Sequence, residues 1–330
     1  MTRQKLLRIL FLTVCLFVFV FPAVIGAGFA WVYYPERFEE AKAFLRERNE
    51  SIGVFIDGYF KELRNTVRIL AAMPEVSEIP WLDGAGKAKV LRLYREIQRQ
   101  NPNIYYIYSG YTDGSLLIND YEPPPGYDPR VRPWYKAVMG APVPGKEVVG
   151  LLYREAKTQE LLLATVHILE SPEHGFTGAV SIDSYTREIS AQIERRSDIY
   201  HSARSFIVDD KGTILVHPQP EYIGRNVEEI FGENPVIRAG TYFPYVEGLQ
   251  RRVAYISGIP IAGWRLVTTV DEEEIRGPIL RRLSLYALAL MVVCLALGLI
   301  LAYIWRNRVI RPLLSLATAQ ASGWRCRSAC

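Results

Sequence analysis

The stretch "NIYYIYSGYTDGSLLIN", residues 103–119, decides the fold class of this 330-residue chain. Apolar and aromatic residues alternate with smaller or polar ones on both sides of Asp113-Gly114, which predicts two β-strands joined by a tight turn. The pattern returns in "ARSFIVDDKGTILVHP", residues 203–218, where the turn falls at Lys211-Gly212. We therefore predict two similar units in series, each built around an antiparallel hairpin.

The segments around these hairpins predict an α+β fold. Further strands are expected at 176–184, 242–256 and 263–270, and a short helix is expected at 186–195. Upstream, apolar residues recur at helical spacing from 36 to 73, which predicts one long amphipathic helix that Pro74 ends. A second helix is expected over residues 87–100.

Two uncharged stretches flank these units. Residues 9–34 and 283–305 carry no charged side chain, and each is long enough to cross roughly 30 Å of hydrocarbon as a helix. The basic start at Arg3, Lys5 and Arg8 also fits a signal peptide, but the apolar run is long for one and ends in the interfacial residues 31–34. We expect two transmembrane helices, cytoplasmic segments at 1–8 and 306–330, and an extracytoplasmic domain at 35–280, in the inner (plasma) membrane.

Cysteine usage fits this layout. Cys15 and Cys294 lie in the two apolar stretches, Cys326 and Cys330 lie in the tail, and the predicted outer domain has none. A domain without disulfides must be stabilised by its hydrophobic core. The periplasm or outer surface of a prokaryote fits this usage better than a disulfide-rich secreted setting.

The loop "YDPRVRPWYKA", residues 127–137, combines fixed charge with aromatic surface. Arg132 can hold a carboxylate through two parallel hydrogen bonds, and Pro133 stiffens the loop. Trp134 and Tyr135 can form an apolar wall with polar tips, and Tyr127 can close the same end. This combination predicts a site for a small carboxylate. The second cation of the loop, at position 130, fits either a surface ion pair or a ligand contact.

An α-amino acid also needs an acceptor for its ammonium group. Asp183 is the candidate, because it ends a hydrophobic strand where a carboxylate is costly unless it has a partner; the other interpretation is a cap on the helix that begins near Thr186. Among the tyrosines of the first hairpin, Tyr106, Tyr108 or Tyr111 is expected to line the site.

The layout resembles the double Cache sensor domains of bacterial and archaeal chemoreceptors, histidine kinases and cyclic-dinucleotide enzymes, over roughly residues 36–272. "YDPRVRPWYKA" resembles the ligand loop of their membrane-distal module, and "DDKGTILVHPQPEYIGRNV", residues 209–227, resembles their membrane-proximal module. The resemblance implies two tandem PAS-like antiparallel-sheet modules, at about 75–197 and 198–272.

By position, the resemblance to the amino-acid-binding subgroup of this family implies a set of ligand-binding residues. They are Tyr127, Arg132, Trp134, Tyr135, Tyr153 and Asp183. At position 153 the chain departs from the family pattern, because it reads "LLYREAKTQE" where the family more often has Pro-Tyr and a Thr-Gly turn.

The resulting hypothesis is a membrane-anchored sensor that binds an amino acid in the distal module and signals across the membrane, as in chemotaxis or two-component systems. The alternatives are a sensor of another small carboxylate or amine, and an anchored binding protein without a signalling role. A homodimer is expected, since it is the commonest symmetric assembly and would cover the long helix. "VIRPLLSLATAQASG", residues 309–323, resembles the start of a HAMP linker, whereas the final "WRCRSAC" does not continue it. We therefore expect either a lost output domain or a cytoplasmic signalling partner.

Enzymatic and nucleic-acid functions find no support in the sequence. It contains no Walker loop, nucleophile elbow or HExxH motif, so no catalytic residue and no cofactor are expected. The four histidines are scattered and do not form a metal-ligand set. The cationic clusters adjoin the apolar stretches, which favours a lipid bilayer over nucleic acid as their partner.

Overall fold

The computed structural model describes residues 12, 16–140, 146–195, 197–231 and 240–312. It divides into two units: a globular unit, Lys42–Glu272, and a helical unit made of the described residues before Lys42 and after Glu272. The helices are α2 (Phe21–Ala71), α3 (Pro74–Ser77), α4 (Gly84–Gln100), α5 (Pro133–Met139), α6 (Arg187–Glu194), α7 (Glu228–Phe231) and α8 (Glu272–Trp305). Short 3-10 and π segments lie at η1 (Leu16–Val20), η2 (Ile79–Trp81), η3 (Pro129–Val131), η4 (Pro220–Tyr222) and η5 (Arg306–Ile310).

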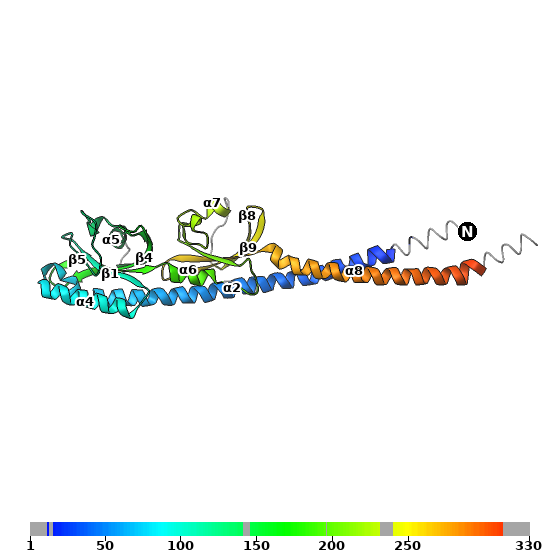
Figure 1. Ribbon diagram of the computed structural model, residues 1–330, viewed down its shortest axis with the longest axis horizontal. Helices are drawn as coiled ribbons and strands as arrows, with labels where there is room; N and C mark the ends of the chain where they lie inside the picture. Colours follow the sequence, from blue (N-terminus) through cyan, green and yellow to red (C-terminus); the bar gives the residue numbers. More distant parts are fainter. Residues whose placement is uncertain (1–11, 13–15, 141–145, 196, 232–239, 313–330) are drawn as a thin grey trace, which may run out of the picture. The chain divides into compact units, whose positions relative to one another are not determined.

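The strands form two antiparallel sheets of five strands each, both in the globular unit (Figure 1). The first has the order β2-β1-β5-β4-β3 and the second the order β7-β6-β10-β9-β8. The strands are β1 (Ile104–Tyr111), β2 (Leu116–Ile118), β3 (Glu147–Arg154), β4 (Leu161–Ser171), β5 (Gly175–Tyr185), β6 (Arg204–Val208), β7 (Ile214–Val216), β8 (Thr241–Glu247), β9 (Gln250–Ile259) and β10 (Trp264–Asp271). We call the part from α3 to α6 the first module and the part from β6 to β10 the second module.

The two predicted hairpins are confirmed. β1 pairs with β2 around Asp113-Gly114, and β6 pairs with β7 around Lys211-Gly212. Both turn glycines have positive φ, +87° at Gly114 and +82° at Gly212, a conformation that glycine adopts without steric cost. The predicted combination of a long helix with two antiparallel sheets is therefore the observed α+β fold.

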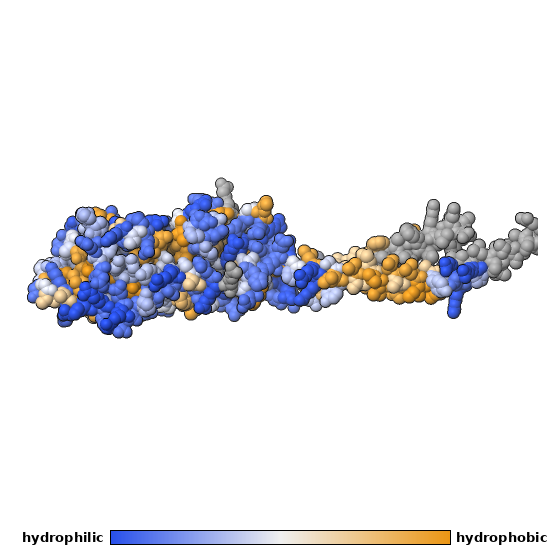
Figure 2. All heavy atoms as spheres, viewed as in Figure 1, coloured by the Kyte–Doolittle hydropathy of each residue, from blue (hydrophilic) through white to orange (hydrophobic). Residues whose placement is uncertain are grey.

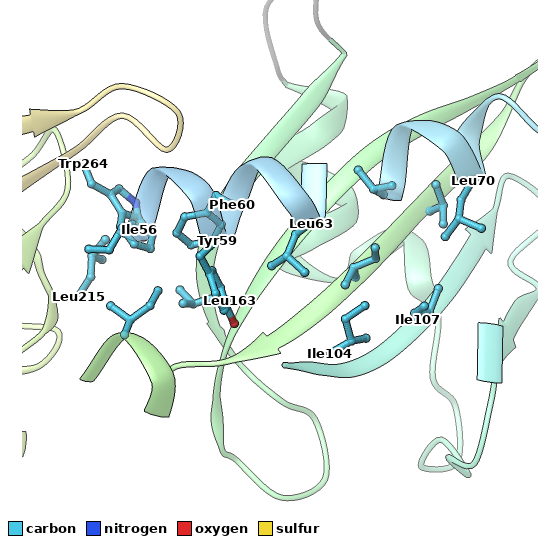
Figure 3. Close-up of a cluster of buried hydrophobic side chains, with 14 of the residues drawn as sticks. Ile56, Tyr59, Phe60, Leu63, Leu70, Ile104, Ile107, Leu163, Leu215 and Trp264 are labelled. Atoms are coloured by element: carbon cyan, nitrogen blue, oxygen red, sulfur yellow. The ribbon is translucent and has the colours of Figure 1, made fainter. Parts of the chain in front are cut away.

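Helix α2 supplies one wall of the main hydrophobic core. Its buried residues within the globular unit recur at i, i+3 and i+4, as in Ile56, Phe60 and Leu63, so that one face of the helix packs on both sheets (Figure 3). Trp264 of the second sheet packs edge-on against Phe60, with 5.0 Å between ring centroids. A Cβ on Gly150 of β3 would lie only 2.7 Å from Cζ2 of Trp264, so position 150 favours glycine.

The second predicted helix is present as α4 and begins earlier than expected. Asp83 lies at its N-cap and its side chain accepts a hydrogen bond of 2.7 Å from the backbone N–H of Gly86, which satisfies one of the free N–H groups of the first turn. Tyr94 of this helix is fully buried and donates to Ser109 of β1 at 3.1 Å. The helix therefore covers the α2 side of the first sheet and leaves the opposite face to other elements.

Among the described residues, one stretch, Glu272–Arg308, which comprises α8 and the residues just after it, is long and apolar enough to cross a membrane. Its exposed large apolar side chains are mostly leucine, isoleucine and valine, and Figure 2 colours the middle of this stretch as hydrophobic. Of the first predicted span, 9–34, only residues 12 and 16–34 are described, so it is not confirmed. Most of the segment predicted to be HAMP-like, residues 313–330, likewise lies outside the described residues.

Candidate functional site

The face of the first sheet that α2 leaves free carries a second buried cluster. Tyr108 of β1, Ala164 of β4 and Ala179 of β5 belong to it, together with Trp134 and Tyr135 of α5. The sheet contributes small residues at its centre, so the aromatic rings of α5 and of β1 lie against it. This arrangement brings part of the predicted ligand loop onto strand residues that are distant in sequence.

Asp183 lies in this cluster, on β5, and is only 1% exposed. Its carboxylate accepts hydrogen bonds from Tyr108 Oη at 2.9 Å and from Tyr153 Oη at 2.5 Å. The two hydroxyls are 3.2 Å apart. The helix-capping interpretation is not supported, because α6 begins after Thr186 without a side-chain cap.

The electrostatics of Asp183 follow from this burial. Desolvation raises the pKa of Asp183 to about 7, although the hydrogen bonds from Tyr153 and Tyr108 oppose the shift; the charge of Glu155 adds to it. Burial and the adjacent carboxylate in turn raise the pKa values of Tyr153 and Tyr108, so both stay neutral donors. A cation that reached Asp183 would be stabilised by a carboxylate that has no cation beside it among the described residues.

The ligand loop reaches the sheet because of a glycine. η3 and α5 lie over β1 at Gly110, where a Cβ would be 2.5 Å from Pro129 Cβ and 2.8 Å from Trp134 Cη2. Trp134 is 1% exposed and packs edge-on against Tyr108, with 5.0 Å between centroids. Pro133 occupies the first turn of α5, where its missing N–H costs nothing. Tight packing therefore positions the loop.

Arg132 provides the cationic end of the cluster. Its guanidinium carbon lies 5.4 Å from the ring centroid of Tyr127, within cation–π range. Its Nε is buried and has no hydrogen-bond partner among the described residues. Burial raises the pKa of Tyr127, and a hydrogen bond with Trp134 and the charge of Arg132 offset part of that rise. Both side chains therefore lie next to Tyr127.

Two further residues of the loop have different surroundings. Arg130 is exposed and pairs with Asp128 at 2.8 Å, so the surface ion-pair interpretation is the one that the structure supports. Tyr135 packs edge-on against Trp134 with its ring buried, but the charges that act on its hydroxyl are those of Arg130, Asp128 and Asp113. Its ring belongs to the cluster, whereas its hydroxyl faces the charged outer part of the loop.

Glu155 and Tyr121 adjoin this cluster and were not predicted. Glu155 follows β3, is 5% exposed, and accepts a hydrogen bond of 2.6 Å from Tyr121 Oη. Desolvation alone would raise its pKa, but hydrogen bonds from the backbone and side chain of Thr158, from Tyr121 and from the N–H of Lys157 outweigh burial and lower the pKa to about 2. The sequence did contain a signal for Glu155. It stands two positions after Tyr153, just before the turn, and residues two apart along a strand point to the same side.

Of the tyrosines expected to line the site, Tyr108 is placed at the carboxylate and Tyr106 packs at the edge of the same cluster. Tyr111 points to the opposite face, where its hydroxyl donates to the carbonyl of Val76 at 2.7 Å. Elsewhere, His217 has the surroundings of a structural residue: burial lowers its pKa to about 4, and its ring nitrogen accepts from the N–H of Gln219. No group of three metal-ligating side chains occurs among the described residues.

Two five-stranded antiparallel sheets that share one long helix, with an aromatic and charged cluster on the first, define a protein of tandem α+β modules. The model of a family described as "Cache domain" matches residues 39–279, which is most of the chain, and this chain belongs to that family.

Among curated proteins, the chain is similar to the methyl-accepting chemotaxis protein McpA of Pseudomonas putida, with 26% identity over 52% of this chain and 27% of that protein. It is also similar to the methyl-accepting chemotaxis protein PctB of Pseudomonas aeruginosa, with 25% identity over 65% of this chain and 34% of that one. The matched region thus spans about a quarter to a third of these relatives' length. Among solved structures, the ligand-binding domain of the Pseudomonas fluorescens chemoreceptor CtaA in complex with L-isoleucine has a TM-score of 0.62 at 20% identity, covering 75% of this chain and 99% of that one.

Proposed function

We propose that this chain is an extracytoplasmic sensor that binds an amino acid on the first module and passes the signal across a membrane. The observation that carries the proposal is the carboxylate of Asp183, buried without a cationic partner among the described residues, on the sheet face that also holds Trp134 and its neighbour Tyr127. Arg132, with a buried and unpartnered Nε, adjoins Tyr127. An α-amino acid carries the two charges that complement this pair.

The proposed binding mode assigns one role to each end of the cluster. Arg132 holds the ligand carboxylate through paired charge-assisted hydrogen bonds, with Tyr127 beside it. Asp183 accepts the ammonium group, and Tyr153 orients that carboxylate through its hydroxyl. Trp134 and Tyr135 form the aromatic wall on which the Cα of the ligand rests.

The similarity to chemotaxis receptors supports the signalling part of the proposal, and no catalytic step is proposed. In this proposal residues 35–280 lie outside the membrane, the first module is membrane-distal and the second is membrane-proximal. Residues 9–34 and 283–305 span the bilayer, the termini are cytoplasmic, and a cytoplasmic partner or output domain receives the signal. We also propose a homodimer, which disulfide crosslinking of cysteines introduced around Phe38 would test.

A small carboxylate or amine that is not an amino acid is a second candidate ligand. The raised pKa of Asp183 supports this alternative. With a pKa of about 7, a substantial fraction of this carboxyl is neutral near neutral pH and needs no ammonium partner. A simple carboxylate could then bind through Arg132 alone. An anchored binder without a signalling role would share the same site.

Calorimetric titration of the full chain in lipid nanodiscs tests the proposal, with the twenty common L-amino acids, acetate, pyruvate and propylamine as probes. Arg132→Ala should weaken every carboxylate ligand by about 2–5 kcal/mol, the range for removing one side of a buried charge pair, which is roughly 30-fold to several thousand-fold. Asp183→Ala should weaken amino acids comparably and acetate or pyruvate much less, because they carry no ammonium group.

The matched control is Arg130→Ala, since that arginine belongs to the same loop but is exposed and paired with Asp128. It should leave binding within about twofold of the unmodified chain. Amino-acid binding that survives Arg132→Ala unchanged would place the ligand elsewhere. If acetate and pyruvate lose as much as amino acids in Asp183→Ala, the assigned orientation is wrong.

A further inference from the structure

The candidate site has a second buried carboxylate that the binding mode above does not use. Glu155 lies two residues beyond Tyr153, and its charge acts on Asp183, on Tyr127 and on Tyr121. Tyr121, which donates to Glu155, packs edge-on against Tyr106 with 5.3 Å between centroids. Tyr106 lies opposite Asp183 in the register of β1 and β5. Glu155 therefore lies at the ammonium end of the site.

The charges around the site do not balance once an amino acid is bound. Asp183 and Glu155 contribute two negative charges and Arg132 contributes one positive charge, while the common α-ammonium and α-carboxylate groups of the ligand add none. The other cations nearby are engaged: Arg130 pairs with Asp128, and Arg187 lies over the Tyr185 ring at 4.0 Å. Lys157 and Arg154 are exposed on the adjoining turn and strand end, where water screens them.

A ligand of net charge +1 would remove this imbalance. Glu155 is held ionised by the N–H groups of Lys157 and Thr158 and by two hydroxyls, so it does not respond to a nearby anion by taking up a proton. In a buried setting an unbalanced charge is costly, and a complementary charge on the ligand is correspondingly favourable. An acidic side chain on the ligand would meet like charge.

We propose, on the basis of the function proposed above, that Glu155 is a specificity-determining residue that makes this site select amino acids with a positively charged side chain. The ligand class is then the basic amino acids, with neutral ones weaker and acidic ones rejected. Tyr121 positions the Glu155 carboxylate through its hydroxyl and acts on selectivity only through it.

The test compares L-lysine with L-norleucine, which has nearly the same shape and lacks the ε-ammonium group, and adds L-glutamate as the acidic probe. The full chain in nanodiscs should bind lysine about tenfold or more tighter than norleucine, the lower end of the coupling measured for close charge pairs. In Glu155→Gln, which keeps the shape and an acceptor oxygen, this preference should fall below about threefold, because lysine should lose more affinity than norleucine.

The matched control is Glu160→Gln, an exposed glutamate at the other end of the same turn, which should keep the preference for lysine. Glu155→Asp, which retains the charge, should keep part of it. Equal weakening of lysine and norleucine in Glu155→Gln would mean that Glu155 serves only the turn, and equal affinities in the unmodified chain would also overturn the inference. If no amino acid binds to the unmodified chain, the proposed function fails and this inference fails with it, whereas binding without charge selectivity overturns only the inference.

Discussion

The two sheets have the same strand order, but the corresponding faces differ in chemistry. In the first sheet Tyr108 lies opposite Ser181, and its hydroxyl reaches Asp183. At the equivalent register of the second sheet Phe206 lies opposite Val267, and both belong to an apolar cluster. The second sheet therefore lacks a counterpart of the Tyr108 hydroxyl, one of the two hydroxyls that donate to Asp183 in the first sheet.

The carboxylate itself is also absent from the equivalent position. Asp183 pairs in register with Ala164 of the neighbouring strand, and the corresponding pair in the second sheet is Thr269 with Ala254. A threonine hydroxyl at this position carries no charge to attract a ligand ammonium group. The apolar cluster beside it fills the face with side chains of the protein itself.

Two residues further along β10, the second module has an acid that is neutralised internally. Asp271 pairs with Arg252 of β9 at 2.9 Å, and Arg252 is 0% exposed. The guanidinium also donates to the carbonyl of Ser202 at 2.7 Å and to Thr269 Oγ1 at 3.2 Å. The same topology thus leaves the Asp183 carboxylate without a cationic partner among the described residues of the first module and pairs Asp271 with Arg252 in the second, so the proposed function resides in a few side chains rather than in the fold.

Removing Arg252 should have the largest effect on stability. Arg252→Met leaves Asp271 without its cation, and breaking a buried pair from one side costs about 3 kcal/mol, the lower end of the usual range because Asp271 is partly exposed. Urea unfolding of the full chain in detergent micelles, followed by tryptophan fluorescence, measures the change.

If the two modules are independent, the loss of stability in Arg252→Met should not change ligand binding by the first module. Amino-acid affinity should remain within about twofold of the unmodified chain. Arg251→Met is the control, since Arg251 is the exposed neighbour on the same strand, and it should change stability by less than about 0.5 kcal/mol. A large loss of affinity in Arg252→Met would show that the second module contributes to the site.

The pH dependence of binding tests the first module in turn. Because the pKa of Asp183 is raised to about 7 in the free protein, below that pH an incoming ammonium group must displace a proton. Affinity for an amino acid should then fall by up to about tenfold for each pH unit below 7 and be level just above it, as one proton is released per ligand bound. Calorimetry in buffers of different ionisation enthalpy measures that release.

Asp183→Asn is the control for this effect, because an amide does not titrate in this range. Its binding, though weaker, should show no tenfold dependence between pH 5 and pH 7, as expected if Asp183 alone carries the effect. The second module has no carboxyl with a raised pKa at the equivalent position, since residue 269 is a threonine. A pH dependence that persists in Asp183→Asn would assign the titration to another group.

The sequence predicted those features that depend on local order. Neighbouring residues alone determine the hairpins at Asp113-Gly114 and Lys211-Gly212 and the apolar period of α2. These predictions are confirmed. Asp183 could be singled out because a carboxylate is costly in a hydrophobic strand, and Arg132 because its guanidinium, in a loop rich in aromatic residues, can hold a small carboxylate. Whether they bind a ligand stays a prediction.

Contacts between distant residues could not be predicted in the same way. The charge of Glu155 reaches Asp183 only because β3, β4 and β5 are paired, and Arg252 contacts Asp271 only because of the register of β9 and β10. Alternation places Tyr108 and Tyr111, three residues apart on β1, on opposite faces, but which of the two faces carries the site could not be read from β1 alone. Sequence periodicity identifies faces, whereas the partner on each face depends on strand order.

The smallest expected effect concerns the turns that close the equivalent hairpins β3–β4 and β8–β9. Gly248 has φ +62° in the second module, and Gln159 has φ +61° in the first. A left-handed backbone costs a residue with a Cβ roughly 1 kcal/mol relative to glycine. The Gln159 side chain offsets part of this cost by donating to the carbonyls of Glu155, at 3.1 Å, and Ala156, at 3.2 Å.

Two substitutions at position 159 separate these terms. Gln159→Ala keeps the backbone strain and loses both hydrogen bonds, so it should be less stable than the unmodified chain. Gln159→Gly loses the same bonds and also relieves the strain, so it should exceed Gln159→Ala by about 1 kcal/mol in urea unfolding. Gly248→Ala should lose a similar amount in the second module. If alanine and glycine are equally stable at position 159, the strain assigned to this turn is absent, and the two modules close their hairpins by different means.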